Sequence, residues 1–162
     1  MTEKAAERKC FAVVKVRGTI RAQREARETL EMFRLARINH AVLVDNRPSY
    51  MGMLYRVQNY VTWGEVSKEA VAMLLKKRGR LAGGKKLTGE YAQKIGYKSL
   101  DALADAIASC EAEYQKLPNV QPIFKLRPPS KGFKGKTKKS FSAGGEAGYR
   151  GEAINDLIKR MA

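Results

Sequence analysis

Residues 10–66 carry three short strand patterns separated by two helical patterns, and this order is compatible with few folds. In the first strand, CFAVVKVR at residues 10–17, side chains alternate between the two faces of a sheet, and one face is entirely apolar. The opposite face changes from apolar to basic at Lys15 and Arg17, which predicts that one end of it is exposed to solvent. The patterns HAVLVD and YVTWGEV, at residues 40–45 and 60–66, predict the second and third strands.

Helical spacing of apolar residues predicts the two intervening helices. The first is expected from Thr19, as the cap, to about Leu35, and the second from about Ser49 to Asn59. Arg21 and Arg24 would then lie near the first turn, where a bound phosphate would relieve the conflict of a cation with the helix dipole. That Arg21 and Arg24 are simply exposed to solvent is an equally good interpretation of this pattern. The β-α-β-α-β order predicts an α+β fold with the helices on one face of the sheet.

The remaining sequence divides into a helical section and a basic tail. Residues 67–126 begin with a helix capped by Ser67 and ending at Gly79, continue with helices from Thr88 and Ser99, and close on an extended edge segment, QPIFKL. Residues 127–162 form the tail. No regular element is expected before a last short helix at about 151–161, and order in the tail would depend on an anionic partner. Phe133 and Phe141 could stack on bases or pin the tail to its own domain.

Charge narrows the class of partner. The chain has 32 Lys and Arg against 16 Asp and Glu, a net charge of +16 over 162 residues, while 44% apolar residues allow a real core. The surplus is even: 5 charges over residues 1–66, 5 over residues 67–126 and 6 over residues 127–162. A basic excess in every segment predicts contacts with a polyanion on several sides, and nucleic acid is the first candidate.

Several other classes of site find no support in the sequence. The segment from Gly79 to Lys86 has the glycine spacing of a phosphate-binding P-loop, but Lys86 replaces the Ser or Thr and a helix precedes it. His40 is the one histidine, and no catalytic set can be built around it. Cys10 and Cys110 are expected to be reduced, buried thiols. We therefore expect neither a cofactor, nor a metal site, nor enzymatic activity.

The sequence also bears on location. No apolar run approaches the roughly 18 residues that a membrane span requires. The first nine residues, MTEKAAERK, lack the features of a signal peptide, which predicts a cytoplasmic protein. Trp63 and Tyr60 in the third strand could form a stacking surface, although core packing is favoured.

The region from Thr29 to Val61 resembles the signature of a known family. The order and spacing of its residues closely resemble the signature of the large-subunit ribosomal protein L-thirty family, called L-seven in eukaryotes. The phrases FAVVKVRG, VLVDN and YVTWGEVS resemble its three strands, and RLAGGKKLTGEYA and GEAINDLIKRM resemble its longer form in archaea and eukaryotes. With about nine residues before the first strand, the chain looks like the archaeal version. The signature residues are Thr29, Leu30, Phe33, Leu35, Arg37, His40, Val42, Met53, Leu54, Val57, Tyr60 and Val61.

The resemblance implies a ferredoxin-like core, with a three-stranded antiparallel sheet in the order 3-1-2. It also implies a structural protein of the large ribosomal subunit that binds large-subunit rRNA, has ribosomal proteins as neighbours, and has 5S rRNA as a candidate partner. An RNA-modifying or nucleotide-dependent enzyme is the disfavoured alternative, and an RNA chaperone or membrane binder the weakest. From the residues themselves, we expect RNA contacts at Lys15, Arg17, Arg21, Arg24, Arg47, Arg56, Lys85, Lys86, Lys131, Lys134, Lys136, Lys138 and Lys139.

Overall fold

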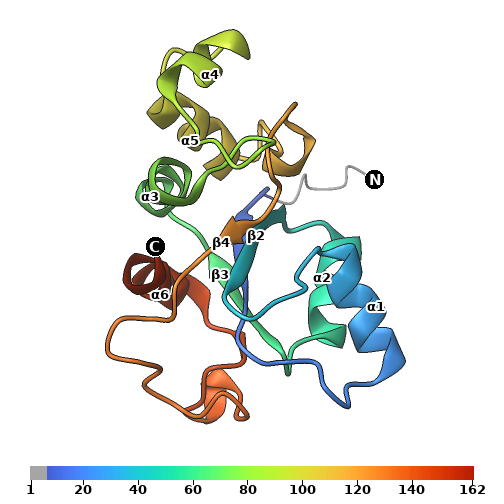
Figure 1. Cartoon of the computed structure of the whole chain (residues 1–162). Coiled ribbons are helices and arrows are strands. Elements are labelled where there is room, and N and C mark those ends of the chain that lie inside the picture. The colour runs from blue at the N-terminus through green and yellow to red at the C-terminus, as the bar shows by residue number, and fades with distance from the viewer. Residues whose placement is uncertain (1–6) are drawn as a thin grey trace.

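The fold is a five-stranded sheet with helices packed on both faces (Figure 1). It was obtained as a computed structural model, which describes residues 7–162. Most of the N-terminal segment that suggested the absence of a signal peptide lies outside these residues. Within the described part of the chain, no helix is both long and apolar enough to cross a membrane.

The centre of the sheet has the expected arrangement. Strands β1 (Cys10–Lys15), β2 (His40–Asp45) and β3 (Val61–Glu65) pair antiparallel, with β1 between the other two. Two short strands extend the edges: β4 (Phe124–Lys125) pairs with β2 and β5 (Gly148–Tyr149) pairs with β3. The full order is β4-β2-β1-β3-β5. The ferredoxin-like order is confirmed, and the sheet has five strands rather than three.

Helices α1 (Arg24–Met32) and α2 (Pro48–Arg56) lie on one face of the sheet, as expected (Figure 1). The core between them and the sheet contains Phe11, Val13 and Trp63 from the strands, with Leu30 and Leu54 from the helices. Trp63 is 1% exposed, so the core-packing interpretation of this residue is confirmed.

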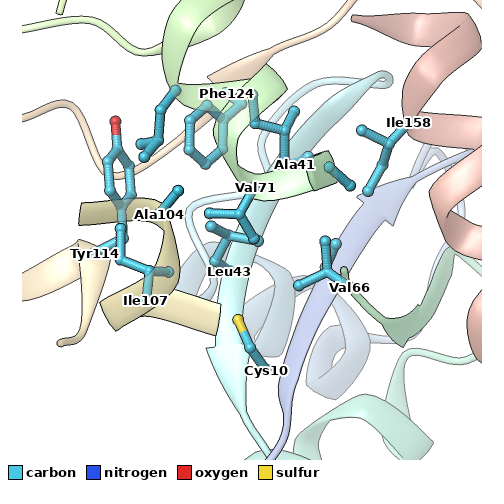
Figure 2. Close-up of a cluster of buried hydrophobic side chains, with 14 of the residues drawn as sticks. Cys10, Ala41, Leu43, Val66, Val71, Ala104, Ile107, Tyr114, Phe124 and Ile158 are labelled. Atoms are coloured by element: carbon cyan, nitrogen blue, oxygen red, sulfur yellow. The ribbon is translucent and has the colours of Figure 1, made fainter. Parts of the chain in front are cut away.

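The other face of the sheet is covered by the helical section and the C-terminal helix. Here α3 (Lys68–Arg78), α5 (Leu100–Ala108) and α6 (Ile154–Met161) bury a second apolar cluster, and α4 (Gly89–Lys94) packs beside α5. Figure 2 shows Leu43 of the sheet, Val71 of α3, Ile107 of α5, Phe124 of β4 and Ile158 of α6 in this cluster. The sheet is thus buried on both faces.

The start of the first helix was predicted wrongly. The α1 helix begins at Arg24 and not at Thr19, because Arg21 has a left-handed backbone with φ 62°. Residues 19–22 instead form a turn, in which the amide of Ala22 donates to the carbonyl oxygen of Thr19 at 3.0 Å. A second left-handed residue, Arg34 with φ 61°, follows the end of the helix. Helix caps at Ser67 and Ser99 are confirmed, since their hydroxyl groups accept from Ala70 and Ala102.

The tail is held to the domain by a buried polar network. The guanidinium group of Arg150 donates to a carboxylate oxygen of Glu146 at 2.6 Å and to the hydroxyl of Thr62 at 2.7 Å. The amide of Gly135 donates to the other Glu146 oxygen at 2.9 Å. Both charged side chains are less than one-tenth exposed. Three short 3-10 helices complete the chain: Tyr114–Lys116, Phe141–Ala143 and Gly151–Ala153.

Candidate nucleic-acid interface

Five arginines gather where β1 ends and α1 and β2 begin. Residues 16–24 and 33–40 contain these arginines and no acidic residue. The two segments lie side by side, since the amide of Asn39 donates to the carbonyl oxygen of Lys15 at 2.9 Å. We call this surface the arginine corner; its residues are Arg17, Arg21, Arg24, Arg34 and Arg37.

Three residues of or beside the arginine corner have a left-handed backbone. Arg21, Arg34 and Asn39 have φ values of 62°, 61° and 67°, a region that side chains other than glycine rarely adopt. Three of the six such residues in the described part of the chain therefore lie at this one surface. Two of them have local causes: Arg34 follows the C-cap of α1, where a left-handed residue is common, and asparagine tolerates this conformation.

Most of the positive charge at this corner is not neutralised by the protein. Arg24 pairs with Glu28 at 2.6 Å, and both side chains are exposed. Among residues 7–162, Arg17, Arg21, Arg34 and Arg37 have no carboxylate within ion-pair distance. The guanidinium group of Arg17 lies 5.6 Å from the centre of the Tyr60 ring, which holds it in place.

His40 shows the effect of this charge. Burial lowers the pKa of His40, and the nearby charges of Lys125, Arg37 and Lys15 lower it further. An excess of positive potential therefore extends across the end of the sheet. An anion bound here would reduce that potential.

An exposed apolar residue lies inside the arginine corner and was not found from the sequence. Ile20 is 92% exposed, between Arg17 and Arg21. The exposure of Ile20 could not be predicted from the sequence, because a helix was expected from Thr19 and Ile20 would have been an ordinary residue of its first turn. Apolar side chains on basic loops can insert between nucleic-acid bases.

Two of the expected RNA contacts, Lys15 and Arg47, are bonded to buried groups of the protein itself. Lys15 is 2% exposed, and its ammonium group donates to the carbonyl oxygens of Leu35 and Ala36, each at 3.0 Å. The expectation that this end of the face is open to solvent is wrong at Lys15. Arg47 pairs with Asp45 at 2.6 Å and also with Glu113, and both carboxylates raise the pKa of Arg47. We leave both residues out of the candidate surface.

The other candidates are exposed. Arg56 lies on α2 with a long ion pair of 3.6 Å to Glu25. Lys85 and Lys86 are at the end of a hairpin that turns at Gly83 and Gly84, where Leu81 donates to the carbonyl oxygen of Lys85 at 2.7 Å. The tail lysines are all exposed on the loop anchored by Glu146; they are Lys131, Lys134, Lys136, Lys138 and Lys139. The structure therefore places the candidates on several separate surfaces.

The two tail phenylalanines have different environments. Phe133 is partly buried against the core cluster around α6, so it pins the tail to the domain. Phe141 is 39% exposed, and the guanidinium group of Arg150 lies 5.0 Å from the centre of its ring. Of the two, Phe141 has a ring surface available for stacking.

No metal-binding geometry is found among residues 7–162. No cluster of three or more His, Cys, Asp or Glu side chains is close enough to hold a metal ion. Cys10 and Cys110 are free thiols, one buried and the other partly exposed. What the described surface offers is uncompensated positive charge on a rigid frame, which suits binding to a polyanion.

Comparison with known proteins finds one family along most of the chain. The family profile described as Ribosomal protein L30p/L7e matches residues 11–61, which span β1 to the start of β3. Large ribosomal subunit protein uL30 from Thermofilum pendens is 47% identical over 152 residues, covering 93% of this chain and 97% of that protein. The proteins of the same name from Methanopyrus kandleri and Archaeoglobus fulgidus are 47% and 44% identical, covering 90% and 93% of this chain and 99% of each relative.

Proposed function

Because the chain belongs to the ribosomal protein L30p/L7e family, we propose that it binds and cross-braces large-subunit rRNA through phosphate contacts at the arginine corner. The family consists of structural components of the large ribosomal subunit and not of enzymes, so the chain is a structural ribosomal protein of archaeal type. Its place is in the large subunit, in the cytoplasm, among rRNA and other ribosomal proteins.

The observation that supports this proposal is the set of arginines without carboxylate partners on two adjacent segments. Four arginines within two adjacent segments repel one another unless an anion lies between them. RNA phosphates supply that charge, and each contact releases condensed counterions. The guanidinium group suits this role because it donates two parallel hydrogen bonds to one phosphate.

Recognition by the arginine corner would depend on RNA shape more than on base sequence. Contacts to phosphate and sugar position a protein without reading bases, and the folded RNA places its phosphates in a particular arrangement. Ile20 adds one apolar contact that phosphates cannot satisfy, so we assign it to an unstacked base. We further propose that 5S rRNA is among the RNAs that the protein contacts.

The test is assembly of large subunits in vitro with Arg17, Arg21 and Arg24 all changed to Ala. We expect incorporation to fall and to become more sensitive to salt, because three phosphate contacts are lost. A matched control changes three exposed lysines on other surfaces to Ala: Lys68, Lys94 and Lys98. Equal incorporation of both variants across a salt titration would exclude the arginine corner as the rRNA-binding surface. The 5S rRNA content of the particles tests the proposed contact with 5S rRNA.

A further inference from the structure

The two cysteines of the chain meet at one place in the fold, although they are 100 positions apart in the sequence. Cys10 is the first residue of β1 and belongs to the apolar cluster between the sheet and α5, where Figure 2 shows it with Ile107 of that helix. Cys110 packs against the same cluster just after α5 ends. Both cysteines line a single cavity of about 20 Å³. A cavity of that size has room for about one water molecule and not for a larger ligand.

The C-terminal end of α5 places Cys110 against the start of the sheet. The amide of Cys110 donates to the carbonyl oxygen of Ile107 at 3.1 Å, and the amide of Glu111 donates to that of Ala106 at 2.9 Å. These two bonds form a Schellman motif, in which Cys110 has the left-handed backbone, with φ 62°. Glycine is the usual residue at that position of the motif. A cysteine therefore stands where the chain reverses direction, and the motif fixes its place beside β1.

The two thiols contact one another and differ in character. The thiol of Cys10 donates a hydrogen bond to the sulfur of Cys110, and this bond, together with burial, raises the pKa of Cys10. The same bond lowers the pKa of Cys110, against the effects of burial, Asp45 and Glu113, and the charge of Arg8 lowers it further. Cys110 is also the partly exposed member of the pair, whereas Cys10 is 6% exposed. The pair thus contains an accessible thiol that ionises more readily and a buried thiol that stays protonated.

We propose that Cys10 and Cys110 are a site of reversible covalent modification, at which a small disulfide compound oxidises the pair to an intramolecular disulfide bond. Such a bond requires two cysteines that face one another at close range, and these two share a cavity and a hydrogen bond. The structure describes both as free thiols, which is the reduced form of the pair. The site is independent of the arginine corner and of RNA binding.

The reaction is a thiol–disulfide exchange in two steps. The Cys110 thiolate attacks one sulfur of a small disulfide, RSSR, so that a mixed disulfide forms and one RS⁻ leaves with the electron pair of the broken bond. The sulfur of Cys10 then attacks the sulfur of Cys110 and releases the second RS⁻. Each RS⁻ takes up one of the two protons that the cysteines lose. Two protein thiols are oxidised, and one RSSR is reduced to two RSH.

The bond would fix the helical section to the sheet, because it joins the start of β1 to the residue that follows the C-cap of α5. It closes a loop of about 100 residues. In the unfolded chain a closed loop of this length removes many conformations, so the oxidised protein should be the more stable form.

The experiment treats the folded full chain with glutathione disulfide and then blocks the remaining thiols with iodoacetamide. Mass spectrometry of the intact protein and of its peptides counts the free thiols and locates any bond. Cys10→Ala is the matched variant, because it keeps the accessible thiol and removes the buried one. Cys110→Ser keeps only the buried thiol. Circular dichroism confirms that each variant is folded, and thermal unfolding compares the oxidised and reduced forms of the full chain.

We expect the full chain to lose both free thiols, to retain no glutathione and to yield a peptide linked from Cys10 to Cys110. Cys10→Ala should stop at a glutathione adduct on Cys110, and Cys110→Ser should react much more slowly. The oxidised chain should unfold at a temperature roughly 5–15 °C above that of the reduced chain.

Three results would overturn the inference: two free thiols after treatment, glutathione retained on Cys110 of the full chain, or an oxidised chain that unfolds at a lower temperature than the reduced one. If Cys10→Ala does not fold, the peptide map and the thermal midpoints of the full chain decide the matter without it.

Discussion

The ammonium group of Lys15 donates a hydrogen bond of 3.0 Å to the buried carbonyl oxygen of Leu35. A second bond of 3.0 Å runs to Ala36, so one lysine joins the end of β1 to the segment that follows α1. This pair shows that a lysine in a basic ribosomal protein can be a structural residue. Burial lowers the pKa of Lys15, as expected of an ammonium group removed from water.

Lys15→Met should therefore affect stability and not RNA binding. The substitution keeps the apolar stem but leaves two carbonyl oxygens without their donor, which should lower the free energy of unfolding by about 1–3 kcal/mol. Urea unfolding measures this loss. Lys9→Met, at an exposed position just before the same strand, is the control and should change stability little. A stable Lys15→Met protein with a smaller salt slope for RNA binding would show that Lys15 contacts phosphate after all.

Glu146→Gln should release the tail from the sheet. The change leaves Arg150 buried without its carboxylate partner, and breaking a buried pair in this way costs roughly 3–5 kcal/mol. We expect a lower unfolding midpoint in urea and faster tryptic cleavage at the exposed tail lysines. Glu152→Gln removes the same charge at an exposed position nearby. If the two variants unfold alike, the buried network does not hold the tail.

The titration of His40 should report the charge at the arginine corner. His40 is the chain's one histidine, so its NMR signal is unambiguous. Its pKa should lie below 6.5, because burial and the neighbouring cations disfavour the charged ring. Lys125→Gln should raise it, and bound RNA should raise it further. A pKa of His40 that RNA leaves unchanged would place the RNA away from this end of the sheet.

The lowered pKa of His40 also predicts how stability depends on pH. In the window between the folded pKa and about 6.5, the unfolded chain binds more protons than the folded chain, so the free energy of unfolding should rise with pH. The contribution is complete above 6.5 and is lost as pH falls through the folded pKa. His40→Gln should remove this component from the pH profile.

Two glycines should respond to alanine in opposite ways. A Cβ atom at Gly64 of β3 would lie 1.9 Å from the carbonyl oxygen of Gly151, so Gly64→Ala should destabilise the fold by about 3 kcal/mol. A Cβ atom at Gly52 of α2 would meet nothing within 4 Å, and Gly52→Ala should stabilise the helix by about 0.5–1 kcal/mol. Thermal unfolding of the two variants measures both effects. A tolerated Gly64→Ala would mean that β3 does not approach Gly151 this closely.

The sequence predicted the elements whose residues show a regular pattern. Alternation in β1 and the apolar spacing of α6 were sufficient, because Ile154, Leu157, Ile158 and Met161 are the buried residues of that helix. The start of α1 was missed because nothing local shows that Arg21 is left-handed; that conformation depends on the surrounding fold. The strand β5 was missed because a Gly-Tyr pair has no pattern of its own and is placed by the Arg150 contacts with Thr62.

The candidate site could be predicted from composition but not in detail. Basic residues in every segment indicated a polyanion, yet the sequence could not distinguish Lys15, which is buried, from Arg17, which is not. It also gave no sign that Arg127 would meet the end of α3, because the two are joined only through the path of the chain after β4. Contacts between distant segments decide which charges stay free.

Cross-linking of the protein to RNA inside intact large subunits tests the central claim most directly. Ultraviolet irradiation followed by mass spectrometry identifies the linked peptides, and sequencing identifies the linked nucleotides. We predict links from residues 17–24 to rRNA. Links confined to α4 and α5, with none at the arginine corner, would contradict the account.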